Sequence, residues 1–211
     1  MVIHNVEQRS SEWYKLRLGK VGGSEADGLM TPAKMKTLIN KKLAEIITGE
    51  AEEVFVNEAM RYGIETEGEA AREYGISNMC EPKEVGYVTN VDYPMFGLSP
   101  DRIVSNTIAV EIKCPTPKSF VQYVIDGKPC INKVKSIPKK YLAQCSMYFL
   151  MMPKIEELDF VVYNDNIKSA NRMYQTRVSR NDMEMEIEKL KAASVVFEKK
   201  MKESLIILKS L

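Results

Sequence analysis

Two acidic residues and a lysine near the middle of the chain have the side-chain types and spacing needed to hydrolyse a phosphodiester. Asp101 follows Pro100, and Glu111, Ile112 and Lys113 come after a short intervening segment. Carboxylate oxygens are preferred Mg²⁺ ligands. A bound Mg²⁺ polarises the phosphate and acidifies water, and a nearby ammonium group offsets the charge that grows on the phosphate. Each half alone has a simpler interpretation, because a Glu-x-Lys is commonly a solvated charge pair and a Pro-Asp a turn.

Two strands must position these side chains. Residues 102–104 and 107–113 are predicted strands joined by a turn at Ser105-Asn106. Alternation along a strand places Glu111 and Lys113 on one face and Ile112 in the core. An antiparallel pairing of the two strands then brings Asp101 close to Glu111.

Helices are predicted on both sides of this centre. The predicted helices are 8–19, 24–30 with Ser24 as N-cap, one starting at Thr31-Pro32, 57–75 ending at Gly75, 117–126, 138–151 and 180–211. Further strands are predicted at 85–91, 94–98, 158–163 and 173–178. The last helix has apolar positions at Ile187, Leu190, Val195, Phe197, Met201, Leu205 and Leu208. This order indicates an α/β (α+β) fold with a central mixed β-sheet flanked by helices.

Length and composition favour one globular domain over residues 1–211, with a C-terminal helix at about 180–211. The 211 residues carry 30 basic and 29 acidic side chains, so net charge alone does not indicate a nucleic-acid partner. The single histidine argues against a His-based metal site or a Ser-His-Asp triad. The cysteines (Cys80, Cys114, Cys130 and Cys145) have no zinc spacing and are predicted to be reduced thiols. No secretory signal or membrane span is expected.

Five sequence blocks, in order from residue 12 to about 152, resemble the lambda exonuclease and YqaJ viral recombinase family. The blocks are EWYKLRLG with GGSE (12–19 and 22–25), GIETEGEAAR (63–72), LSPD (98–101), VEIKCP (110–115) and YLAQ (141–144). The Pro-Asp and Glu-x-Lys pattern is similar to that of restriction-endonuclease-like nucleases. One departure is Arg102, which stands where the family usually has glycine. Arg102 is expected either to reach a phosphate or to point to solvent.

The resemblance implies a role for each residue of the central cluster. Asp101 and Glu111, with the backbone carbonyl of Ile112, would bind two Mg²⁺ ions per site, for which Mn²⁺ would substitute. Lys113 would activate the attacking water. Gln144 would hydrogen-bond within the active site, although its position also suits an ordinary polar residue of an amphipathic helix.

Four further roles lie outside this cluster. Glu67 would supply an additional acidic metal ligand, with Glu65 and Glu69 as alternatives and a solvated helix face as the simpler interpretation. Arg17 and Ser24 would hold the 5′-phosphate of a DNA end. A surface ion pair is the alternative for Arg17, whereas an N-cap at Ser24 is compatible with phosphate binding.

The resemblance also implies an activity and partners. We expect a 5′-to-3′ exonuclease that degrades one strand of linear double-stranded DNA to mononucleotides and leaves a 3′ overhang for phage-type recombination. A homotrimer, a single-strand-annealing partner and a location in the cytoplasm of a bacterial host are expected with it. Lysines within 118–140 and 34–42 are candidates for a phosphate track. The alternatives are a structure- or site-specific endonuclease of the same fold and a catalytically silent DNA-binding accessory protein.

Overall fold

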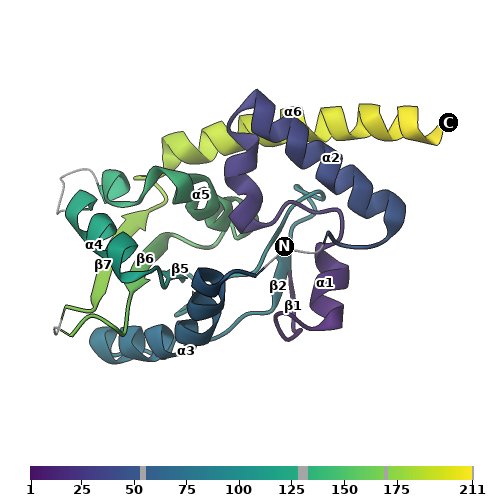
Figure 1. Cartoon of the computed structure of the whole chain (residues 1–211). Coiled ribbons are helices and arrows are strands. Elements are labelled where there is room, and N and C mark those ends of the chain that lie inside the picture. Colours follow the sequence, from purple (N-terminus) through teal and green to yellow (C-terminus); the bar gives the residue numbers. More distant parts are fainter. Residues whose placement is uncertain (53–55, 128–132, 169–170, 211) are drawn as a thin grey trace.

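Two β-sheets lie among helices in the computed structural model of the chain, which describes residues 1–52, 56–127, 133–168 and 171–210 (Figure 1). The helices are α1 (Ser11–Arg17), η1 (Gly23–Leu29), α2 (Pro32–Thr48), α3 (Glu58–Asn78), α4 (Pro117–Asp126), η2 (Lys133–Ser136), η3 (Lys139–Tyr141), α5 (Leu142–Met151) and α6 (Glu184–Lys209), with η marking 3₁₀ turns. The strands are β1 (Val2–His4), β2 (Tyr87–Thr89), β3 (Gly97–Leu98), β4 (Arg102–Ile103), β5 (Ile108–Lys113), β6 (Glu157–Tyr163) and β7 (Met173–Ser179).

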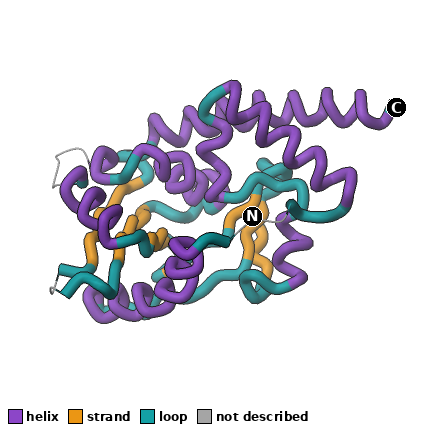
Figure 2. The backbone as a smooth tube through the Cα atoms, viewed as in Figure 1, coloured by secondary structure: helices purple, strands orange, loops and turns teal. Residues whose placement is uncertain are grey.

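The larger sheet is mixed, as predicted. Its order is β4-β5-β6-β7, with β5 and β6 parallel and the two outer pairs antiparallel. Arg102 pairs with Val110 and Ile103 with Ala109, which confirms the expected antiparallel neighbours. Figure 2 shows this sheet apart from the smaller one. The catalytic candidates therefore lie on adjacent strands at one side of the larger sheet.

Strand β5 separates a core face from a functional face. Val110 and Ile112 are buried against α3, in a cluster with Tyr74. The alternate residue Glu111 points to the opposite face, where the α5 side chain of Tyr148 contacts it. The period-2 alternation read from the sequence is thus realised, with one helix on each face of the strand.

The smaller sheet holds the N-terminal segment against the segment that leads to Asp101. Its order is β1-β2-β3, and β1 was not predicted from the sequence. Beyond β1, the Gln8 side chain donates to the Pro100 carbonyl at 3.1 Å, and Trp13 Nε1 donates to Ser99 Oγ at 2.7 Å. The backbone just before Asp101 is therefore fixed by side chains from the start of the chain.

Several predicted helix boundaries differ from those of the structure, and two of the differences have a clear physical reason. Helix α3 does not end at Gly75 but continues to Asn78, with Met79 in the left-handed conformation as its C-cap. Gly75 instead permits a close approach, since a Cβ there would lie 2.8 Å from the Cys80 carbonyl oxygen. The N-cap of the turn η1 is Gly22 and not Ser24. The backbone N–H of Gly22 donates to Glu25 Oε2 at 2.9 Å.

Helix α6 packs on the body through part of its length and extends beyond it (Figure 1). Ile187, Leu190, Phe197 and Met201 are buried as predicted, and the ring of Phe197 lies 5.8 Å from that of Phe96. Two other predicted apolar positions of this helix, Val195 and Leu208, are instead 68% and 37% exposed. None of the helices in the described ranges has the length and apolarity of a membrane span.

The cysteines that the structure describes, Cys80, Cys114 and Cys145, are free thiols. Cys145 is buried and the other two are partly buried. Cys130 lies outside the described residues.

Candidate active site

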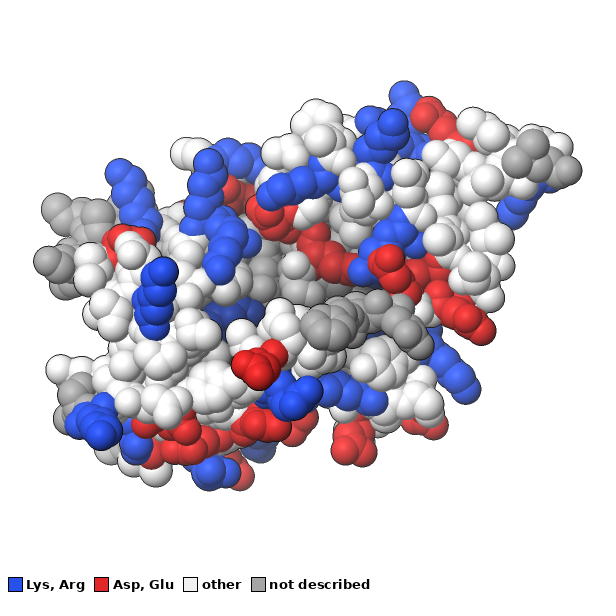
Figure 3. Space-filling model, viewed as in Figure 1, with Lys and Arg blue, Asp and Glu red and all other residues white. Residues whose placement is uncertain are grey.

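Most of the predicted site residues converge on one open cleft of about 620 Å³. It lies between α3, β5, η1 and the segment around η3, and Figure 3 shows the surface hollowed between the α2–α5 half and the α3 half. The predicted residues that line it are Ser24, Glu67, Asp101, Ile112 and Lys113. Residues distant in the sequence are thus gathered where the strands β4 and β5 meet helix α3.

Glu111 is the fully buried centre of a hydrogen-bond network beside this cleft. Its Oε1 forms an ion pair with the Lys113 ammonium and accepts a 2.6 Å hydrogen bond from Gln144 Nε2. Its Oε2 accepts a 2.6 Å hydrogen bond from the hydroxyl of Tyr148. A buried carboxylate requires such partners, because its desolvation is otherwise costly. The structure therefore brings Glu111, Lys113 and Gln144 into direct contact.

Asp101 lies next to this network and is held by the backbone. Its Oδ2 accepts a 2.7 Å hydrogen bond from Ile112 N–H, and its own N–H donates to the Tyr148 hydroxyl at 3.2 Å. Burial, followed by repulsion from the Glu111 carboxylate, raises the pKa of Asp101 well above its ordinary value. Two buried carboxylates so close together favour the binding of a cation between them.

Lys113 is the resident cation of the site. Burial alone would lower the pKa of Lys113, but the carboxylates of Glu111 and Asp101 outweigh it and raise that pKa above its ordinary value. Its ammonium also lies 5.1 Å from the centroid of the Tyr141 ring. Lys113 therefore stays charged at neutral pH.

Tyr148 also contacts both acidic residues, and the sequence analysis did not identify it. It is fully buried, and its hydroxyl joins the two acidic residues by donating to Glu111 and accepting from Asp101 N–H. The signal available in the sequence was its spacing from Gln144, since side chains four residues apart share a helix face.

Glu67 is the acidic residue of α3 that faces the cleft. The alternative Glu69 accepts a 2.8 Å hydrogen bond from the Tyr163 hydroxyl, and Glu65 is exposed outside the cleft lining. Glu67 forms ion pairs with Arg102, at 3.1 Å, and with Arg9, at 3.7 Å. Arg102 therefore points to Glu67 and not to solvent.

The donor set fits one hard divalent cation. Asp101 and Glu111 offer carboxylate oxygens beside the carbonyl of Ile112, and oxygen is the ligand that Mg²⁺ prefers. Burial, and after it the neighbouring Glu111 carboxylate, raise the pKa of Asp101, and a bound cation would offset both effects. Within the described residues, no three acidic, histidine or cysteine side chains are grouped closely enough to hold an ion by themselves. A cation here would thus be shared by two side chains, a backbone carbonyl and water.

The residues expected to hold a 5′-phosphate lie around the Gly22-Gly23 pair. The Arg17 guanidinium lies 4.1 Å above the Trp13 ring, and a Cβ at Gly22 would be only 2.9 Å from Arg17 Nη2. A Cβ at Gly23 would be 3.5 Å from Gln144 Cγ. The two glycines thus let this loop pass between Arg17 and helix α5, with Ser24 reaching the cleft.

A buried charge network fixes the same loop. Lys42 is 4% exposed and its ammonium lies 2.9 Å from Glu25 Oε2 and 3.0 Å from Glu45 Oε1. Glu25 accepts from Gly22 N–H and Glu45 from Gly19 N–H. The prediction that Lys42 belongs to a phosphate track is therefore wrong, because its ammonium is buried between two carboxylates.

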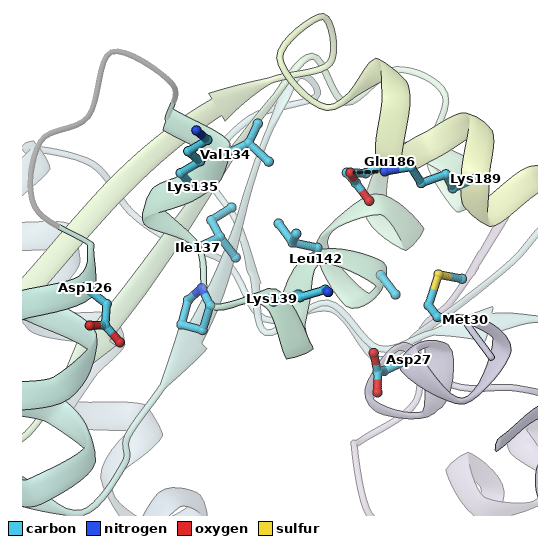
Figure 4. Close-up of a pocket in the computed structure, with 12 residues that line it drawn as sticks. Asp27, Met30, Asp126, Val134, Lys135, Ile137, Lys139, Leu142, Glu186 and Lys189 are labelled. Carbon is cyan, nitrogen blue, oxygen red and sulfur yellow. Dashed lines mark hydrogen bonds and ion pairs between the residues drawn. The ribbon is translucent and has the colours of Figure 1, made fainter. Parts of the chain in front are cut away.

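A second cavity, of about 660 Å³, lies on the other side of η3. Figure 4 shows the ammonium of Lys139 pointing into it, between Leu142 of α5 and Asp27 of η1. Lys135 lines the same cavity. Lys140, which directly follows Lys139, lines the cleft that contains Asp101. Exposed lysines thus continue from the cleft across this face, where basic side chains gather at the upper left of Figure 3.

Comparison with known proteins gives a match to a family model and to solved structures. A model of the YqaJ-like viral recombinase domain matches residues 12–151. The crystal structure of an alkaline exonuclease (LHK-Exo) from Laribacter hongkongensis is 28% identical, with a TM-score of 0.83, covering 95% of this chain and 97% of that one. The same exonuclease in complex with dAMP is 27% identical, with a TM-score of 0.79 and coverage of 95% and 99%.

Two further comparisons add less. The structure of a phage-related exonuclease from Haemophilus somnus 129PT is 13% identical, with a TM-score of 0.65, covering 88% of this chain and 96% of that one, and it supports the fold alone. No curated protein gave a significant match.

The matched residues include the Pro-Asp segment, β5 with Glu111 and Lys113, and the part of α5 that carries Gln144 and Tyr148. The match extends over more than half of the chain and includes the whole cleft-lining segment of α3. The chain therefore belongs to the family of YqaJ-like viral recombinase domains.

Proposed function

We propose that the chain is a Mg²⁺-dependent exonuclease that degrades one strand of linear double-stranded DNA from 5′ to 3′. It would release mononucleotides and leave a 3′ single-stranded end for recombination. The observation that carries the proposal is the contact of Glu111 with Lys113 and Gln144 beside Asp101, at an open cleft. Similarity to an alkaline exonuclease over nearly the whole length of both chains supports it.

The residues divide the chemistry among them. Asp101, Glu111 and the Ile112 carbonyl would hold Mg²⁺, for which Mn²⁺ would substitute. When bound, the ion supplies Lewis acidity toward the phosphate and lowers the pKa of water. Lys113 would orient the attacking water and neutralise charge that develops on the phosphate. Gln144 would hold Glu111 in place through their 2.6 Å hydrogen bond. Arg17 and Ser24 would bind the 5′-phosphate of the DNA end.

DNA would lie across the lysine-bearing face. Lys118, Lys135, Lys139 and Lys140 are exposed, and phosphate contacts of this kind bind a duplex without reading its sequence. Such binding suits an enzyme that degrades any linear DNA.

The decisive experiment is digestion of a blunt linear duplex carrying 5′-phosphates, with a label at either the 5′ or the 3′ end. We expect early release of 5′-labelled mononucleotide in Mg²⁺, none in EDTA, and none with Lys113→Ala. Lys199→Ala is the matched control, because Lys199 is exposed on α6 and lines neither the cleft nor the second cavity. Cleavage of closed circular DNA would instead favour an endonuclease, and full activity of Lys113→Ala would discard the proposed site.

We also propose that the chain acts as a homotrimer in the cytoplasm of a bacterial host, together with a single-strand-annealing protein. The trimer and the annealing partner are both expected from the resemblance to the lambda exonuclease family. Sedimentation velocity tests the first, with an expected mass three times that of the 24.0 kDa chain. A monomer at micromolar concentration would contradict it.

A further inference from the structure

Glu67 lies in the cleft with Asp101, yet both of its oxygens face cationic side chains. Oε1 is 3.1 Å from Arg102 Nη1, and Oε2 is 3.7 Å from Arg9 Nη2. The Arg102 side chain is 11% exposed and that of Glu67 21%. A pair so shielded from water is screened less than a surface ion pair.

Arg102 is fixed in this position by its strand and by a second hydrogen bond. It belongs to β4, paired with Val110 of β5, and the same Nη1 also donates to the Asp101 backbone carbonyl. Its guanidinium is thus held between the Asp101 backbone and Glu67. Arg9 contributes less, because its side chain is 47% exposed and its ion pair is longer.

Building on the proposed nuclease function, we infer that the Arg102 guanidinium takes the place of a second metal ion at Glu67. The site then binds one divalent cation per chain, at Asp101 and Glu111, rather than the two expected from the family resemblance.

Charge balance supports a single ion. Asp101, Glu111 and Glu67 with one phosphodiester bring four negative charges into the cleft. Lys113 and Arg102 contribute two positive charges, so one divalent ion completes neutrality, and the more exposed Arg9 beside Glu67 adds positive charge beyond that. A second divalent ion would have to displace Arg102 from Glu67 and would leave the cleft with excess positive charge, which low-dielectric surroundings penalise.

The test counts bound Mn²⁺ by electron paramagnetic resonance, with and without saturating nucleoside monophosphate. The wild-type chain is expected to bind about one ion. Arg102→Ala and Arg102→Met, the latter keeping most of the side-chain volume, are expected to bind about two. Adding Glu67→Gln to either variant should return the number to about one. Arg9→Ala is the matched control and should stay at about one. Circular dichroism verifies the fold of each variant.

Two outcomes overturn the inference while leaving the nuclease proposal intact: two ions in the wild-type chain, or one ion in both Arg102 variants. The absence of any bound Mn²⁺ in the folded wild-type chain would instead overturn the metal site of the nuclease proposal itself, and the inference with it.

Discussion

The hydroxyl of Tyr148 donates a 2.6 Å hydrogen bond to Glu111 Oε2 and also accepts from the backbone N–H of Asp101. One side chain on α5 therefore sets the relative position of the two carboxylates from which we build the metal site. Groups that orient metal ligands in this way commonly affect both metal affinity and activity.

We expect Tyr148→Phe to lower both nuclease rate and Mn²⁺ affinity by about 10- to 100-fold. The loss of folding stability should be small, about 1 to 3 kcal/mol, as for one buried hydrogen bond. Tyr163→Phe is the matched control, because the Tyr163 hydroxyl donates to Glu69 outside the cleft. Equal Mn²⁺ affinity in both variants would show that Tyr148 has only a structural role.

The local chemistry of β5 could be predicted from sequence. Alternation along the strand predicts that Glu111 and Lys113 share a face while Ile112 is buried, and the structure has this arrangement. The sequence suffices here because side chains alternate between the two faces of a strand, and because only a short turn precedes β5.

Long-range pairings could not be predicted in the same way. The buried position of Lys42 depends on Glu25 of η1, which packs against α2 and adds to the local pair of Lys42 with Glu45, and a run of lysines does not reveal this. The engagement of Arg102 with Glu67 likewise depends on how α3 packs against β4. Composition predicts solvent exposure for such charges, and only tertiary structure supplies their partners.

Gly75 and Gly68 provide a test of the α3 boundary. Glycine inside a helix normally costs stability relative to alanine, so Gly68→Ala, whose Cβ meets nothing within 4 Å, should stabilise the fold by about 0.5 to 1 kcal/mol. Gly75→Ala should destabilise it by about 1 to 3 kcal/mol, since the new Cβ would lie 2.8 Å from the Cys80 carbonyl. Urea unfolding measures both. Stabilisation by Gly75→Ala would contradict the close packing described.

The raised pKa of Asp101 predicts a pH dependence for the metal-free protein. The folded state binds more protons than the unfolded state between the ordinary value, 3.8, and the folded value of this pKa. The stability contributed by protonated Asp101 is therefore complete below about pH 3.8 and is lost as pH rises through the folded pKa. In EDTA, Asp101→Asn should become progressively more stable than the wild type over that interval, because asparagine carries no charge to be buried beside Glu111.

The measurement is the difference in Tm between the two proteins across pH, with exposed Asp92→Asn as the control. Adding Mg²⁺ at neutral pH should stabilise the wild type by mass action and leave Asp101→Asn nearly unchanged. A pH-independent difference in EDTA would contradict the assigned environment of Asp101.

We expect Arg17 to speed digestion of DNA ends that carry a 5′-phosphate and not of ends that carry a 5′-hydroxyl. Its guanidinium is held over Trp13 beside the Gly22-Gly23 pair, and Ser24 at the end of this loop reaches the cleft. A charge-assisted hydrogen bond to a 5′-phosphate contributes about 1.5 to 3 kcal/mol, so Arg17→Ala should slow digestion of 5′-phosphorylated duplex by roughly 10- to 100-fold. Digestion of the same duplex with 5′-hydroxyl ends should change little, because no phosphate is bound there. Lys15→Ala removes an exposed cation from the same helix and should spare both substrates. Equal losses on the two kinds of end would assign Arg17 to general DNA binding or to folding, and the phosphate of the DNA end would then need another partner.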